Sequence, residues 1–143
     1  MTQPARRPDL PPDPARDHLK AVRLGLFRLH KALIDAARAD WETEVGAQSP
    51  GQFLQGLLHE DRFEWLRPFS GLIVRIDEAL AAREPLAEGQ AQAFVDEVAG
   101  LVLVEDDDDR ARRVAAARLR DPTIAFLQGE LSRRIAEGPP PAA

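Results

Sequence analysis

Hydrophobic residues recur along most of this chain at spacings of three and four, the period of an α-helix with one buried face. The longest such stretch covers residues 13–45. Its apolar positions are Leu19, Val22, Leu26, Leu29 and Leu33. Asp13 as N-cap, Pro14 at the first helical position and Gly46 as a C-terminal stop mark its ends. The pattern predicts one long helix.

Shorter helical patterns follow, separated by proline, glycine and aspartate. We expect helices over residues 50–58, 61–83 and 88–104, then from the acidic run 105–109 to residue 121, and over 122–135. Pro68 lies inside the third helix, where proline removes a hydrogen bond and clashes with the preceding turn. This predicts a kinked third helix, or two abutting helices, near Arg67.

The pattern contains no convincing strand, and short connections make neighbouring helices antiparallel. The prediction is therefore an all-α fold, an irregular up-and-down bundle of five or six helices. It occupies one domain, residues 13–137, with disordered tails at 1–12 and 138–143, where prolines cannot continue a helix.

The composition of the chain limits the classes of partner and the cellular compartment that can be expected. The chain has 143 residues, enough for one domain, and a net charge of −5 that disfavours general binding to nucleic acid or acidic lipid. It has no cysteine, which excludes disulfides and thiolate metal sites and suits a reducing compartment. No apolar run approaches the roughly 20 residues that cross a bilayer. A soluble, cytoplasmic protein without membrane or nucleic-acid partners is expected.

Two ionisable residues project onto apolar helical faces. His30 falls near the middle of the first helix's apolar face, with Arg23 and Glu44 on the same line, and Asp77 falls near the middle of the third helix's apolar face. Residue 30 lies sixteen positions before the end of the first helix, and residue 77 lies sixteen positions after the start of the third. If the two helices are antiparallel, both residues reach the same level. Because an unpaired buried charge is costly, we predict a contact between His30 and Asp77, completed by Ser70 or a water.

That pair has two interpretations. The simpler one is a structural polar contact that fixes the register of the helices. The other is a pH-sensing or catalytic histidine, because histidine titrates near neutrality and a carboxylate can orient its ring. The corresponding ligand pocket, between the first and third helices, has as candidate binding residues His30, Trp41, Arg67, Ser70 and Asp77.

Metal and cofactor motifs are missing. None of the three histidines has the acidic residue three positions earlier that di-iron bundles use, and no zincin motif or glycine-rich phosphate loop occurs. The acidic run at 105–109 lacks the spacing of a calcium loop. It is better explained as helix N-terminal acids, with Asp108 or Asp109 paired to Arg112 or Arg113. No cofactor, metal or catalytic residue is expected.

Trp65 lies off the main apolar stripe of the third helix. It either packs in a second layer, against the short second helix, or forms part of an exposed patch used for association.

Two segments carry a family resemblance. Residues 29–35 (LHKALID) and 65–73 (WLRPFSGLI), with Ile76, Asp77 and Glu78 after the second, resemble a family of small bacterial all-helical proteins. The similarity covers residues 18–135. It implies a helical fold and a bacterial cytosolic setting, and it provides no activity or site residues.

The expected function is therefore binding. In the absence of a catalytic constellation, wide apolar helical faces favour a protein-interaction or regulatory module that can self-associate. The alternative is a small-ligand-binding protein or enzyme that uses the pocket near His30 and Asp77.

Overall fold

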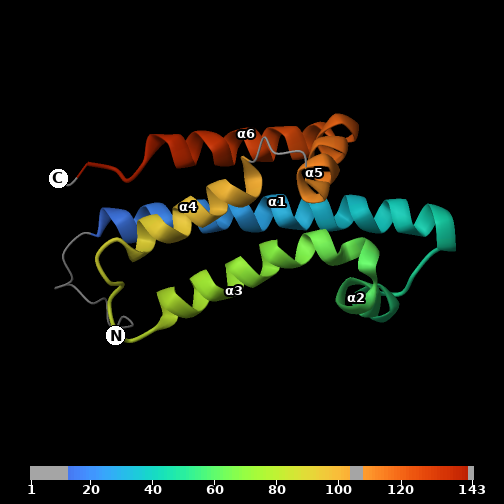
Figure 1. Cartoon of the computed structure of the whole chain (residues 1–143), viewed down its shortest axis with the longest axis horizontal. Coiled ribbons are helices and arrows are strands. Elements are labelled where there is room, and N and C mark those ends of the chain that lie inside the picture. Colours follow the sequence, from blue (N-terminus) through green and yellow to red (C-terminus); the bar gives the residue numbers. More distant parts are fainter. Residues whose placement is uncertain (1–12, 104–107, 142–143) are drawn as a thin grey trace, which may run out of the picture.

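The computed structural model describes residues 13–103 and 108–141, and within these ranges helices are the only regular secondary structure, without strands (Figure 1). The α-helices are α1 (Pro14–Val45), α2 (Pro50–His59), α3 (Arg67–Ala81), α4 (Gln90–Val102), α5 (Asp109–Arg120) and α6 (Pro122–Glu137). A 3-10 helix, η1 (Asp61–Leu66), precedes α3. The all-α bundle is confirmed. The tail predicted at residues 1–12, most of the acidic run and the last two residues lie outside the described residues.

Local chemistry explains where the helices begin. The Asp13 side chain accepts a hydrogen bond from the Arg16 amide at 3.0 Å, which caps α1 as expected. Ser49 and Gln52 form a reciprocal capping box at the start of α2. Asp108 caps α5, and Asp121 caps α6 one residue after α5 ends. These caps satisfy backbone amides that have no partner inside the helix.

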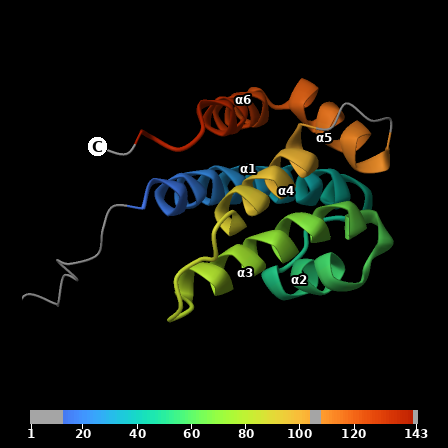
Figure 2. The same ribbon diagram turned by 60° about the vertical axis from the view of Figure 1, so that its left-hand side comes forward.

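α1 is the central element of the bundle. Figure 1 shows α6 and α3 running antiparallel to it on opposite sides, with α4 crossing between them, and Figure 2 shows the same order from another direction. Its five predicted apolar positions are fully buried. Gly25 lets α6 approach closely, because a β-carbon there would lie 3.0 Å from a Leu131 methyl group.

The predicted third helix is two abutting elements. The chain forms a 3-10 helix up to Leu66, and the α-helix begins at Arg67, with Pro68 in its first turn. Proline is well tolerated there because the first amides of a helix have no intrahelical partner. The expected break near Pro68 is therefore confirmed.

An aromatic cluster joins α2 and η1 to the end of α1. The ring of Trp41 lies 6.2 Å from that of Phe53 and 5.4 Å from that of Phe63, centroid to centroid. Gly56 makes room for the indole, because a β-carbon at this position would lie 2.8 Å from Trp41. As a result, the last turns of α1 extend past the start of α3 and cover α2 and η1.

None of the helices in the described ranges combines the length and apolar character needed to cross a membrane.

Candidate functional site

The structure separates His30 from Asp77, so the predicted contact between them is wrong. The Asp77 carboxylate accepts two hydrogen bonds from Arg23, at 2.7 and 2.8 Å. His30 instead stacks on Phe69, with ring centroids 5.9 Å apart and planes 10° apart. Phe69 precedes Asp77 by eight residues, about 12 Å along a helix axis.

The error came from the register of the two helices. The count placed the end of the first helix level with the start of the third helix at Asp61, whereas the end of α1 extends past the start of α3 to cover α2 and η1. Arg23 had been placed on the same line of α1 as His30, two turns earlier. The correct partner of Asp77 could therefore be found in the sequence, but the axial offset between α1 and α3, which selects that partner, could not.

The remaining predicted binding residues have separate structural contacts. Trp41 belongs to the aromatic cluster described above. Arg67 donates to the Leu57 carbonyl at 3.3 Å and to the Glu60 carbonyl at 3.1 Å, at the C-terminal end of α2. The Ser70 hydroxyl donates to the Arg67 carbonyl at 3.1 Å. The structure does not bring the five predicted residues together around one cavity.

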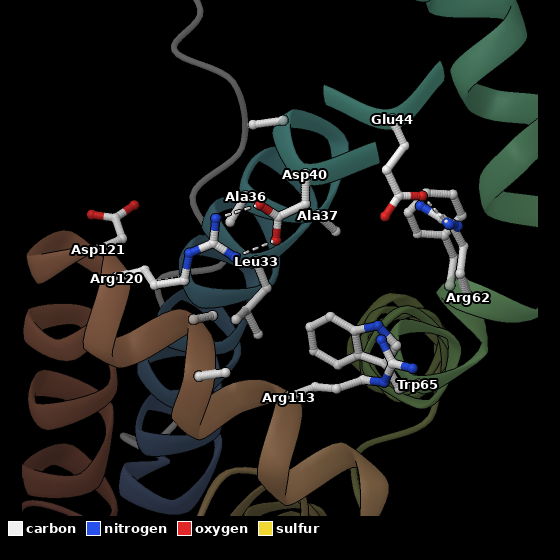
Figure 3. Close-up of a pocket in the computed structure, with 14 residues that line it drawn as sticks. Leu33, Ala36, Ala37, Asp40, Glu44, Arg62, Trp65, Arg113, Arg120 and Asp121 are labelled. Carbon is white, nitrogen blue, oxygen red and sulfur yellow. Dashed lines mark hydrogen bonds and ion pairs between the residues drawn. The ribbon is translucent and has the colours of Figure 1, made fainter. Parts of the chain in front are cut away.

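A cavity of about 560 Å³ lies instead between the second half of α1, η1 and α5 (Figure 3). We call it the α5 cleft. Two sets of apolar side chains and one set of charged side chains line it. Its floor is formed by Leu33, Ala36, Ala37, Ala116 and Ala117, its wall by Phe63 and Trp65, and its rim by Asp40, Glu44, Arg62, Arg113, Arg120 and Asp121.

The 3-10 geometry of η1 sets the wall of the cleft. With three residues per turn, side chains three apart share a face. Phe63 and Leu66 are buried in the core, Arg62 and Trp65 line the cleft, and Asp61 and Glu64 are exposed. Trp65 is half-buried and packs partly against the core, which is why it lay off the stripe of an α-helical projection. Of its two expected roles, packing is confirmed, and a role in association stays a prediction.

Ion pairs hold the rim of the cleft. Arg120 binds Asp40 through two contacts of 2.8 and 2.7 Å, across 80 residues of sequence. Arg62 binds Glu44 at 2.6 Å, and Arg113 binds Asp109 at 2.9 Å. The Asp109 to Arg113 pair confirms the helical spacing expected for the acidic run. Figure 3 shows the Arg113 side chain extending from α5 toward the Trp65 indole.

The sequence contained only indirect signals for this site. Small side chains on α1 and α5 leave the space between these helices unfilled, namely Ala36, Ala37, Ala39, Ala116 and Ala117. Trp65 was identified, but the partners Asp40 and Arg120 were not, because their contact depends on how α5 crosses α1.

The polar groups that line the α5 cleft are carboxylates and guanidinium groups. Its lining contains no serine, threonine, cysteine or histidine. Its carboxylates are engaged, since Asp40 and Glu44 bind arginines and Asp121 accepts from the Thr123 amide at 2.9 Å. Within the described residues, no cluster of three histidine, aspartate or glutamate side chains is arranged to hold a metal ion.

Two histidines have perturbed titration outside this cleft. Burial lowers the pKa of His30, and the backbone of Leu66 opposes that shift. Burial also lowers the pKa of His18, assisted by the Arg134 charge and opposed by Glu137. His18 is 4% exposed and its Nε2 has no hydrogen-bond partner in the described structure.

Comparison with protein-family models, with curated proteins and with solved structures finds no match to this chain.

Proposed function

We propose that this protein is an interaction module that binds a segment of another protein through the α5 cleft. The observation that supports this is a cavity with an apolar floor, an aromatic wall and a rim of ion pairs. Protein interfaces have the same arrangement, with an apolar centre surrounded by a polar, solvated rim. A cavity of about 560 Å³ has room for a large apolar anchor side chain and its neighbours.

Because the carboxylates of the rim already have partners, the cleft is better suited to a protein segment than to a small polar ligand. Small-ligand pockets usually present a few polar groups that converge on the ligand. Here Asp40, Glu44 and Asp121 already have partners, so a small polar ligand would have to compete with these contacts. An apolar anchor would cover the alanine floor and leave them intact.

The alternative pocket between α1 and α3 has less support. His30 is stacked on Phe69 and Asp77 is held by Arg23, so both groups that suggested a ligand or a reaction are committed to structural contacts. We therefore propose that these residues fix the packing of α1 and α3 rather than bind a substrate.

The proposal also includes the cellular location of the protein. A chain without cysteine suits the reducing interior of a cell. Together with the resemblance of residues 18–135 to small bacterial helical proteins, this supports a bacterial cytosolic protein.

The proposal can be tested by selecting peptides on the intact protein from a display library. Ala116→Trp fills the floor of the α5 cleft, whereas Ala115→Trp adds the same side chain at an exposed neighbouring position outside it. Selected, fluorescently labelled peptides should bind the wild type and the Ala115→Trp variant equally. Their affinity for Ala116→Trp should fall by about tenfold or more, as expected for loss of a buried anchor.

Two results would contradict the proposal. One is a library that yields no peptide above background on the wild type. The other is a set of peptides that bind the blocked variant as tightly as the wild type. Light scattering across micromolar concentrations addresses the remaining possibility, self-association, because a monomer throughout would exclude a second copy as the bound partner.

A further inference from the structure

One buried polar side chain of this protein has no hydrogen-bond partner. His18 is the one polar residue in the described ranges that is buried, and its Nε2 atom makes no hydrogen bond there. It lies in the second turn of α1, at the end of the bundle where α6 also ends (Figure 1). Because a buried polar atom without a partner costs free energy, the groups that cover this imidazole decide how it responds to a proton.

A cavity of about 370 Å³ lies beside His18 and has three walls. The first turns of α1 and the last turn of α6 form two of them, and residues 138–141 (Gly-Pro-Pro-Pro) form the third. We call residues 138–141 the proline segment. Figures 1 and 2 both show it, in red, leaving α6 and running beside the first turns of α1. It is the one wall of the cavity that does not belong to a helix.

Few interactions hold the proline segment in this position. The Gly138 amide donates to the Ile135 carbonyl at 3.3 Å, and this is the one hydrogen bond that the segment makes with the described part of the chain. Its three prolines have no backbone N–H to donate, and they are exposed. The segment can therefore leave α1 while both helices stay wound, and segments with so few contacts open at low free energy.

Three charged side chains line the same cavity. Arg134 and Glu137 come from α6 and Asp17 comes from α1, whereas the proline segment adds no charge. Burial lowers the pKa of His18, the Arg134 charge lowers it further, and Glu137 opposes the shift. A proton on His18 therefore creates a cation that burial and Arg134 disfavour more than Glu137 stabilises it. Contact with water would relieve this cost.

We propose that protonation of His18 releases the proline segment from the ends of α1 and α6. In the closed state the imidazole is neutral and the segment covers it. When the ring gains a proton, displacement of the segment lets water reach the new charge without unwinding either helix. The open state binds the proton more tightly than the closed state, so acid favours the open state. This end of the bundle is then a pH-sensitive switch that exposes residues 138–141.

A paramagnetic probe on the full chain measures this release. The chain has no cysteine, so Pro140→Cys provides a single attachment point for a nitroxide. The nitroxide should broaden the amide signals of the first turns of α1 at about pH 7.5, and this broadening should fall at least about twofold at about pH 5. The circular dichroism of the helices should stay constant. Broadening that persists after the His18 ring signals titrate, or that disappears only together with the helical signal, would overturn the proposal.

Removal of the titrating group tests its role directly. His18→Phe keeps a ring at this position but cannot take up a proton, so the nitroxide should broaden α1 equally at about pH 7.5 and about pH 5. His59→Gln removes a histidine from the exposed end of α2 and should release the segment as the wild type does. Undiminished release in the His18→Phe variant would assign the switch to another group and overturn the proposal.

Two charge changes on α6 test the direction of the coupling and leave the buried ring unaltered. Arg134→Gln makes a charged His18 easier to accommodate in the closed state, so release at about pH 5 should become smaller. Glu137→Gln removes the opposing charge, so release should become larger. Arg133→Gln changes the neighbouring arginine, which pairs with Glu130 and does not line the cavity, and should leave release unchanged. The reverse order of the Arg134 and Glu137 variants, or no difference between them, would contradict the switch.

Discussion

At the scale of single residues, arginine side chains hold separate helices of this protein together. Arg16 donates to the Leu80 carbonyl at 2.7 Å, at the end of α3, and Arg38 donates to the Gln48 carbonyl at 2.7 Å. Arg67 does the same at the end of α2. Cationic side chains suit the ends of α2 and α3 because the last carbonyls of a helix carry partial negative charge and lack an intrahelical partner. The Gln48 carbonyl lies instead in the connection between α1 and α2.

The pairing of Arg23 with Asp77 predicts a measurable coupling. A double-mutant cycle with Arg23→Ala and Asp77→Ala should give an interaction energy of about 0.5–1 kcal/mol, modest because both side chains are partly exposed. The same cycle between His30→Ala and Asp77→Ala should give an energy near zero. Denaturant unfolding measures both, and a coupling between His30 and Asp77 larger than that of Arg23 would contradict the observed register.

The buried His18 and the half-buried His30 predict how stability depends on pH. Both have a folded-state pKa below the ordinary value of 6.5, which applies when the chain is unfolded. The unfolded chain therefore binds more protons below about pH 6.5, and stability is lost as the pH falls through the folded-state pKa values. Each histidine contributes a slope of at most about 1.4 kcal/mol per pH unit.

This pH dependence can be assigned by substitution. In urea unfolding between pH 7.5 and about pH 5, His18→Gln and His30→Gln should each flatten the decline in stability. His59 lies exposed at the end of α2, so His59→Gln serves as the control that leaves the profile unchanged. A wild type whose stability rises on acidification would contradict the assignment.

At the scale of elements, two helical glycines make opposite predictions. Gly56 lies under the Trp41 indole, and Gly129 in α6 has nothing within 4 Å of the position of a β-carbon. Gly56→Ala should destabilise the protein by about 1–3 kcal/mol because it forces the aromatic cluster apart. Gly129→Ala should stabilise it by about 0.5–1 kcal/mol through backbone entropy.

Thermal or urea unfolding of the two variants measures the difference directly. Because both changes add one methyl group to a helical position, each variant is the control for the other. Equal effects would show that the approach of Gly56 to Trp41 is not a packing constraint.

Element boundaries were well predicted where local chemistry decides them. The sequence predicted the N-cap Asp13, the helix starts at residues 50 and 122 and the break at Pro68. The 3-10 form of η1 was not predicted, since six residues that precede a proline can continue a helix in more than one way. Only the packing of Phe63 and Leu66 into the core selects the three-residue turn that places Trp65 on the cleft.

At the scale of the whole molecule, α1 connects every other part of the structure. Its buried leucines contact α3, α4 and α6, whereas α2 buries only Phe53 and Gly56 and packs at one end of the bundle. The free energy of local unfolding should therefore be higher for α1 than for α2, because α1 makes more buried contacts. Native-state hydrogen exchange should show the strongest protection in the middle of α1 and much weaker protection in α2. Equal protection of the two helices would indicate a single cooperative unit.

The sequence by itself determined the helical content, most helix ends and the buried face of each helix, because caps, prolines and three-to-four spacing act within a few residues. It also identified Arg23, His30, Trp65 and Asp77 as exceptional positions. Only the tertiary structure decided their partners and formed the α5 cleft. Those features depend on how far one helix slides past another, which is fixed by the fit of distant side chains such as Trp41 over Gly56.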